Sequence, residues 1–317
     1  MVKSYVFATV LAFALSAVLL KLWIPLLRKW KAGQNILSYV KEHKKKGGTP
    51  TMGGIAFVFG AVIVTCFFAP MDRRLTICLA VGLSYMAVGV LDDVLKKRRK
   101  ENLGLRAWQK FAFQTAIALL CGVYCARSGQ TLLRLPFTEK TVAIGWWILP
   151  LSALVFLATV NAVNLTDGLD GLASGVSVPF FLALGVVISL QTGDNGFSVL
   201  SFCLVGALLA FLLFNVHPAS VFMGDTGSLA LGGFASSIAV FTGNSLYVPV
   251  LGACFVFTVL SVLIQVAYFK ATGGKRVFLM SPVHHHFQEK GHSETRISYA
   301  YFVITLMIGA LTVACIL

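Results

Sequence analysis

Long apolar runs separated by short polar segments make up most of the chain. Nine of these runs are roughly 16 to 23 residues long, close to the ~20 residues that a helix needs to cross a bilayer. They lie at 5–27, 53–69, 75–91, 109–126, 142–160, 172–190, 197–214, 248–269 and 297–317. A tenth run, 229–247, is rich in Gly and Ser, and only about 13 of its residues are solidly apolar. Because backbone groups inside a bilayer must pair with one another, the pattern predicts an all-α polytopic membrane protein with one domain, residues 1–317.

Composition supports a membrane environment. Of the 317 residues, 57% are hydrophobic and 12% are charged, about half the charged share of an average globular domain. The seven cysteines are mostly isolated inside apolar runs and have no metal-ligand spacing, so we expect small core residues and not disulfides. The first run is not followed by an A-x-A-like cleavage site, which favours a retained span over a signal peptide.

The distribution of Lys and Arg bears on whether the tenth run crosses the bilayer. With ten spans, one face receives the segments 28–52, 92–108, 161–171, 215–228 and 270–296. Together with Lys110, these segments hold 19 of the 26 Lys and Arg residues. With nine spans, the five basic residues of 270–296 would move to the poorer face. The positive-inside bias therefore favours about ten helices with both termini extracytoplasmic, and makes 127–145 a small extracytoplasmic loop or hairpin.

Nine of the 12 acidic residues also fall on the predicted cytoplasmic face. Two of them, Asp92 and Asp93, end the third span in "GVLDDVLKKRRK". They point about 100° apart on a helix, whereas Asp92 and Lys96 share a face. The pair is either a solvated helix end or part of a site for Mg²⁺ and phosphate, which carboxylates beside a basic run commonly form.

A second acidic pair lies in "NAVNLTDGLDGLA", residues 161–173. Asp167 and Asp170 would share one face if this stretch were helical. A helix-capping role for one Asp does not explain the second acid together with Asn161 and Asn164. Because no Lys or Arg is near in the sequence, we expect the partner of these acids to be a metal or a substrate.

Three further motifs complete the predicted cytoplasmic face. Asp225 lies in the Gly-rich turn "MGDTGS" and either caps the following helix or binds a cation. The run His284–His286 cannot place three rings on one tetrahedral ion, which favours contacts with phosphates over zinc or a merely interfacial cluster. An extended backbone would point His284 and His286 to one side and His285 to the other.

The basic segment "KEHKKKGGTPTMGG" lacks a P-loop signature, and its Lys45 would contact either substrate or anionic lipid.

Together these groups are suited to magnesium-assisted transfer of a phospho-sugar at one membrane surface. In order along the chain, "GGTPTMGG", "LDDVLKK", "NLTDGLDGLA", "FNVHPASVFMGDTGS" and "SPVHHHF" resemble the motifs of phospho-N-acetylmuramoyl-pentapeptide transferases. The resemblance extends over essentially the whole chain. It implies a multi-pass enzyme of the bacterial inner membrane, often a homodimer, that uses Mg²⁺ and binds no nucleic acid. Its substrates would be UDP-MurNAc-pentapeptide and undecaprenyl phosphate, and its products lipid I and UMP.

The resemblance also implies roles for individual residues. Asp92 and Asp93 would be the catalytic pair, Asp225 the Mg²⁺ ligand and a catalytic residue, and His284 a further catalytic group. The implied substrate contacts are Lys45, Lys96, Asn161, Asn164, Asp167, Gly168, Leu169, Asp170, Asn215, Phe222, Gln265, His285 and His286. One departure is Gln288, which stands where the family more usually has Glu.

Two other functions remain open at this point. Polyprenyl-phosphate GlcNAc-phosphate transferases share the acidic motifs but lack the "GGTPTMGG" and triple-His patterns found here. A membrane transporter would also contain carboxylates, but usually near the bilayer midplane and between inverted repeats. Here the acids gather at one face, and no internal inverted repeat is visible.

Overall fold

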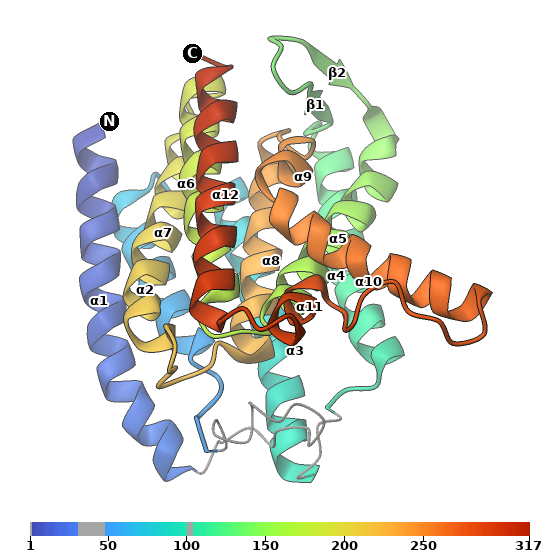
Figure 1. Ribbon diagram of the computed structural model, residues 1–317. Helices are drawn as coiled ribbons and strands as arrows, with labels where there is room; N and C mark the ends of the chain where they lie inside the picture. Colours follow the sequence, from blue (N-terminus) through green and yellow to red (C-terminus); the bar gives the residue numbers. More distant parts are fainter. Residues whose placement is uncertain (1, 31–47, 100–103) are drawn as a thin grey trace.

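The computed structural model describes residues 2–30, 48–99 and 104–317, so Lys45 lies outside the described residues. The first half of the described chain contains α1 (Val2–Lys29), α2 (Gly54–Phe68), α3 (Arg73–Arg99), α4 (Ala107–Arg127), β1 (Leu132–Arg134), β2 (Thr141–Ala143), η2 (Gly145–Trp147) and α5 (Ile148–Thr166). The second half contains α6 (Leu172–Gln191), α7 (Asn195–Asn215), α8 (Gly224–Phe241), α9 (Tyr247–Leu251), α10 (Ala253–Ala271), α11 (Val283–Glu289) and α12 (Glu294–Ala314). Figure 1 shows most of the long helices running side by side in one bundle.

The helices confirm an all-α, multi-pass membrane protein. Seven helical segments of the described chain are long and apolar enough to cross a bilayer: Val2–Lys29, Arg73–Arg99, Gly145–Thr166, Leu172–Gln191, Asn195–Asn215, Ala253–Ala271 and Glu294–Ala314. The remaining predicted runs are helical too, as α2, α4 and α8. Helix α8 begins at Gly224, five residues before the predicted run. The apolar pattern did not include its first turn, because that turn is polar and contains Asp225.

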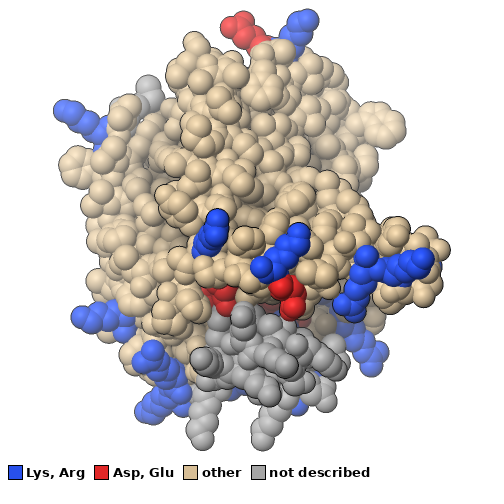
Figure 2. Space-filling model, viewed as in Figure 1, with Lys and Arg blue, Asp and Glu red and all other residues tan. Residues whose placement is uncertain are grey.

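The two ends of the bundle differ in character. Both chain termini and the β1–β2 hairpin lie at one end in Figure 1, and α11 lies toward the other. Strand β1 pairs with β2 in antiparallel register, which confirms the hairpin predicted within 127–145. In the same orientation, Figure 2 shows most charged side chains in the half of the molecule away from the hairpin.

Helix α8 lies at the centre of the bundle, where it packs against α3 and α5. Every residue from Thr226 to Phe241 is buried, which explains why a helix rich in Gly and Ser needs no continuous apolar surface. Glycine also permits the close approach of its neighbours. A Cβ on Gly89 of α3 would lie 2.2 Å from the backbone oxygen of Asp225, and a Cβ on Gly54 of α2 would lie 2.3 Å from Cα of Gly227.

Replacing Gly89 should therefore separate α3 from α8. We expect Gly89→Ala to lower the free energy of unfolding by about 1–3 kcal/mol, the usual cost of overpacking a well-packed core. Gly175→Ala in α6 is the matched control, because its added Cβ would meet only Phe302 Cβ, at 4.0 Å. Thermal unfolding in detergent would measure both variants. Equal melting temperatures for the two would refute the packing argument.

Candidate functional site

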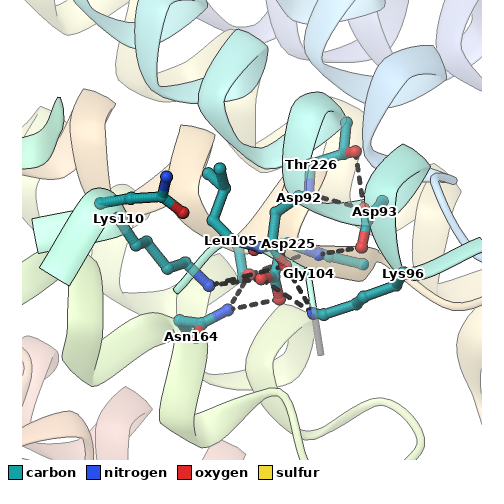
Figure 3. Close-up of polar contacts among 12 residues, drawn as sticks. Asp92, Asp93, Lys96, Gly104, Leu105, Lys110, Asn164, Asp225 and Thr226 are labelled. Atoms are coloured by element: carbon teal, nitrogen blue, oxygen red, sulfur yellow. Dashed lines mark hydrogen bonds and ion pairs between the residues drawn. The ribbon is translucent and has the colours of Figure 1, made fainter. Parts of the chain in front are cut away.

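Three carboxylates meet where the end of α3 contacts the start of α8. Asp92, Asp93 and Asp225 each offer an oxygen atom, and these atoms lie within 4.8 Å of one another. Figure 3 shows the group together with Lys96, Lys110 and Asn164, which come from α3, α4 and α5. Four helices thus bring together residues that are far apart in the sequence.

Asp92 is 2% exposed and lies beside a cation. Its Oδ2 is 2.7 Å from Lys96 Nζ, which confirms that these i,i+4 residues share a face. Its Oδ1 accepts a hydrogen bond from the backbone N–H of Leu105 at 2.8 Å. A Cβ on Gly104 would lie only 2.6 Å from Oδ1, so a glycine is needed where this segment crosses the carboxylate. Asp92 is therefore held rigidly with one oxygen toward Lys96.

Asp93 points in a different direction, as the 100° offset predicts, and caps α8. Its Oδ2 accepts hydrogen bonds from the hydroxyl of Thr226 at 2.7 Å and from the backbone N–H of Thr226 at 3.0 Å. Its Oδ1 accepts one from the backbone N–H of Asp225 at 3.3 Å. The first N–H groups of a helix have no partner within the helix and attract negative charge. Asp93 therefore fixes the position of Asp225.

Asp225 is the centre of the group. Its Oδ1 accepts a hydrogen bond from Asn164 Nδ2 at 2.9 Å, and its Oδ2 lies 3.1 Å from Lys96 Nζ. Lys110 also forms an ion pair with Oδ2. The sequence reasoning used Lys110 only to assign topology and missed this contact. The available signal was a single lysine just inside an otherwise apolar span.

The triple-His segment lies against the turn that follows α5. A Cβ on Gly168 would be 2.5 Å from His284 Nε2 and 3.2 Å from His285 Nε2. The segment is helical, as α11, so the arrangement of an extended backbone, in which His285 would lie opposite the other two rings, does not apply. Pro282 immediately precedes α11, at a helix start where its missing N–H costs little. Helical geometry separates the three rings by about 100° each.

Two groups at this contact have shifted pKa values. His284 is fully buried, and neither ring nitrogen has a hydrogen-bond partner among the described residues. Burial lowers its pKa to about 3, so the ring is neutral at physiological pH. Burial raises the pKa of Asp167 to about 8, with further contributions from the negative charges of Asp225, Asp93 and Asp170. At physiological pH the Asp167 carboxyl is therefore largely protonated, and a cation bound beside it would lower its pKa.

Asp170 belongs to a separate contact. Because α5 ends at Thr166, residues 167–171 form turns, and the condition for Asp167 and Asp170 to share a helix face is not met. Asp170 Oδ2 lies 2.9 Å from His217 Nδ1 and accepts a hydrogen bond from the N–H of Ala219 at 3.1 Å. Asp170 thus has a protein neighbour, His217 of the α7–α8 loop, and Asp170, His217 and Glu294 together could hold a metal ion, so the expected metal or substrate partner stays a prediction. Glu294 of α12 accepts a hydrogen bond from the Asp170 N–H at 3.2 Å.

Several residues that were predicted to contact substrate form hydrogen bonds with other residues of the protein. Asn215 accepts hydrogen bonds from Gly171 N–H and Ser174 Oγ and donates one to Val221. Gln265 bonds the backbone of residues 277 and 278, and Asn161 donates to Gln114 Oε1. Asn215 and Gln265 thereby hold neighbouring loops in place, whereas Asn161 joins α5 to α4.

The other predicted contacts lie around these loops. Leu169 is buried and Phe222 is half-buried. His285 Nδ1 lies 2.7 Å from Gln288 Oε1, so the residue that departs from the family pattern orients a histidine of the motif. His286 Nδ1 accepts a hydrogen bond from the N–H of Leu279 at 3.1 Å.

The acidic group has the donor chemistry of a magnesium site. Mg²⁺ prefers carboxylate oxygen atoms and binds through one or two of them while keeping water or phosphate ligands. Asp92 and Asp225 supply such atoms at one point, whereas the oxygen atoms of Asp93 bond the start of α8. The ammonium groups of Lys96 and Lys110 lie on the same carboxylates. The three carboxylates could hold a metal ion, and the two ammonium groups beside them could pair with an anionic group.

Comparison with known proteins identifies the family. Residues 75–243 match the family model for glycosyl transferase family 4. A phospho-N-acetylmuramoyl-pentapeptide-transferase of Caldanaerobacter subterraneus is 42% identical over 308 residues, 97% of each chain. Relatives with the same name from Geobacillus kaustophilus and Heliobacterium modesticaldum are 43% and 44% identical, over 98% and 96% of this chain and 97% and 95% of the relatives. The chain therefore belongs to the phospho-N-acetylmuramoyl-pentapeptide-transferase family.

Proposed function

We propose that this chain transfers phospho-MurNAc-pentapeptide from UDP-MurNAc-pentapeptide to undecaprenyl phosphate, which gives lipid I and UMP for peptidoglycan synthesis. The observation that carries the proposal is the buried group of Asp92, Asp93 and Asp225 with two lysines at one end of a membrane bundle. A soluble nucleotide-sugar and a membrane-bound phosphate can meet only at such a surface. On this proposal the group faces the cytoplasm of a bacterial inner membrane, and both termini lie on the opposite side.

Each residue of this group has its own proposed role in phosphoryl transfer. We assign Asp225, with Asp92 beside it, as the ligands of Mg²⁺, which when bound neutralises negative charge on the diphosphate. Asp92 and Lys96 orient the phosphate of the lipid acceptor for attack on the phosphorus atom that joins the sugar. Asp93 holds the first turn of α8, and thereby Asp225, in place. Lys110 offsets charge that builds up on Asp225 and on the departing UMP.

Phe222 is the proposed stacking surface for the uracil ring. It is half-buried beside the Gly-rich start of α8, where a planar base could lie against its face. We expect Phe222→Ala to weaken UMP binding by about 1–3 kcal/mol, the size of one base–aromatic stack. Isothermal calorimetry would measure this, with the exposed Phe257 of α10 as the control position. Unchanged UMP affinity would mean that the Phe222 ring packs within the protein and does not stack on uracil.

Release of UMP tests the proposed reaction. Detergent-solubilised protein would receive UDP-MurNAc-pentapeptide, undecaprenyl phosphate and Mg²⁺, and UMP and lipid-linked product would be quantified together. We expect both to form in equal amounts and to require all three additions. Turnover of UDP-GlcNAc in place of the muramoyl substrate would indicate the related GlcNAc-phosphate transferase activity, and a transporter would release no UMP.

A further inference from the structure

A polar pocket lies apart from the acidic group, under the outer part of α10. Its volume is about 580 Å³. Its walls come from α10, from the segment between α10 and α11, and from α11 itself: Gln265, Val266, Phe269, Lys270, Arg276, Leu279, Met280, Ser281 and Glu289. In Figure 1 this part of the chain projects away from the bundle, and Figure 2 shows basic side chains gathered over it. None of the roles proposed above uses these basic residues.

The pocket is connected to the proposed active site through α11. This helix places His284 and His285 against Gly168, next to Asp167. The same helix supplies Glu289 to the pocket, and its His286 accepts a hydrogen bond from Leu279 of the pocket wall. An α-helix with its side chains is about 10 Å wide. The pocket is therefore about one helix width away from the turn at Gly168, which adjoins the proposed active site.

The pocket offers charges of both signs. Lys270, Arg276 and Glu289 are all exposed at its wall. One N–H group of the Arg276 guanidinium donates to the backbone oxygen of Leu279 at 3.3 Å, which leaves a side chain with five donors able to bind more. Gln265 is 7% exposed and is bonded to the backbone of residues 277 and 278, so it shapes the pocket. The pocket thus suits a ligand that carries a carboxylate together with N–H donors.

We infer that this pocket binds the carboxyl end of the peptide on the nucleotide-sugar substrate, an inference that rests on the proposed function. Lys270 and Arg276 would bind the terminal carboxylate, and Glu289 would accept hydrogen bonds from peptide N–H or amino groups. A muramoyl peptide is joined to its sugar by the amino end, so its free end is a carboxylate. Five extended residues span about 17 Å, enough to pass from the sugar across one helix. A peptide end fits these groups better than an anionic headgroup such as that of phosphatidylglycerol, because it brings N–H donors for Glu289 beside its carboxylate and the headgroup brings none.

A coupling experiment tests the inference. UMP release would give KM for UDP-MurNAc-pentapeptide and for the same substrate with its terminal carboxylate converted to an amide. We expect the amide to raise KM about fivefold for the wild type, a change on the scale of losing one charge-assisted contact at a partly exposed site. The double variant Lys270→Gln, Arg276→Gln should show nearly the same KM for both substrates, because the carboxylate has lost its partners. Its inhibition constant for UDP-MurNAc, which lacks the peptide, should stay within about twofold of the wild-type value.

Lys275→Gln is the matched control, because Lys275 is exposed beside Arg276 but does not line the pocket. The inference is overturned if the double variant keeps the wild-type preference for the free carboxylate. It is also overturned if UDP-MurNAc binding weakens as much as substrate binding, or if the effect depends on anionic lipid in the micelle and not on the end of the peptide. No UMP release from the wild type with any of these substrates would instead refute the proposed function.

Discussion

Asp225→Asn is expected to lower turnover by roughly 10² or more, the scale on which loss of a main electrostatic stabiliser acts. The substitution keeps the size of the side chain and removes its charge. Asp225 is where Asn164, Lys96 and Lys110 converge, so its carboxylate organises the whole group. Without that charge the divalent cation loses an oxygen ligand, and the two lysines lose their shared partner.

Steady-state UMP release at increasing Mg²⁺ concentrations would measure the effect. Glu139→Gln is the control, since Glu139 is an exposed acid next to the β1–β2 hairpin, at the other end of the bundle. We expect wild-type kinetics from the control and both a lower rate and a higher Mg²⁺ requirement from Asp225→Asn. If Asp225→Asn keeps activity within a few-fold of the wild type at an unchanged Mg²⁺ requirement, Asp225 is not the metal ligand.

Asp92→Asn is expected to lower turnover by about 10² or more, within the range that a positioned acid–base group contributes. The neighbouring variant Asp93→Asn should have a different combination of effects on stability and activity. An amide at position 93 would present an N–H group toward the N–H groups of Thr226 and Asp225, so it should reduce stability as well as activity. Within the described residues Asp92 accepts one backbone hydrogen bond, and loss of its charge should affect the rate more than the melting temperature.

Thermal unfolding and UMP release, measured on both variants, separate these roles. The expected order is a clear fall in melting temperature for Asp93→Asn and a much smaller fall for Asp92→Asn. The reverse order would mean that Asp92 supports the fold and Asp93 reacts.

The parts of this architecture that depend on local sequence were predictable. Apolar runs of membrane length predicted the helices, and the segment 127–145 between two such runs was predicted to be the loop or hairpin that joins α4 and α5. The spacing of Asp92 and Lys96 predicted their contact, because i and i+4 residues adjoin on any helix. The motif resemblance also predicted that Asp92, Asp93 and Asp225 belong to one site, and their carboxylates do lie together.

The contacts that need tertiary packing were not predictable from spacing. Lys110 reaches Asp225 because α4 packs beside α3 and α5, and a single lysine just inside an apolar span does not by itself say which acid it will meet. The pairing of Asp170 with His217 likewise joins two loops that are far apart in the sequence. The helical form of α11, which packs against α10 and α12, is a further feature that the triple-His motif did not predict.

The central claim is that the acids between α3 and α8 promote direct attack by the lipid phosphate. A rapid-quench experiment on lipid-stripped protein tests it most directly, because the alternative mechanism makes an aspartate the nucleophile. With UDP-MurNAc-pentapeptide and Mg²⁺ alone, the direct mechanism predicts no burst of UMP. Addition of undecaprenyl phosphate should then release UMP and lipid-linked product in equal amounts. A burst of up to one UMP per active site without acceptor, abolished in Asp92→Asn, would contradict the account.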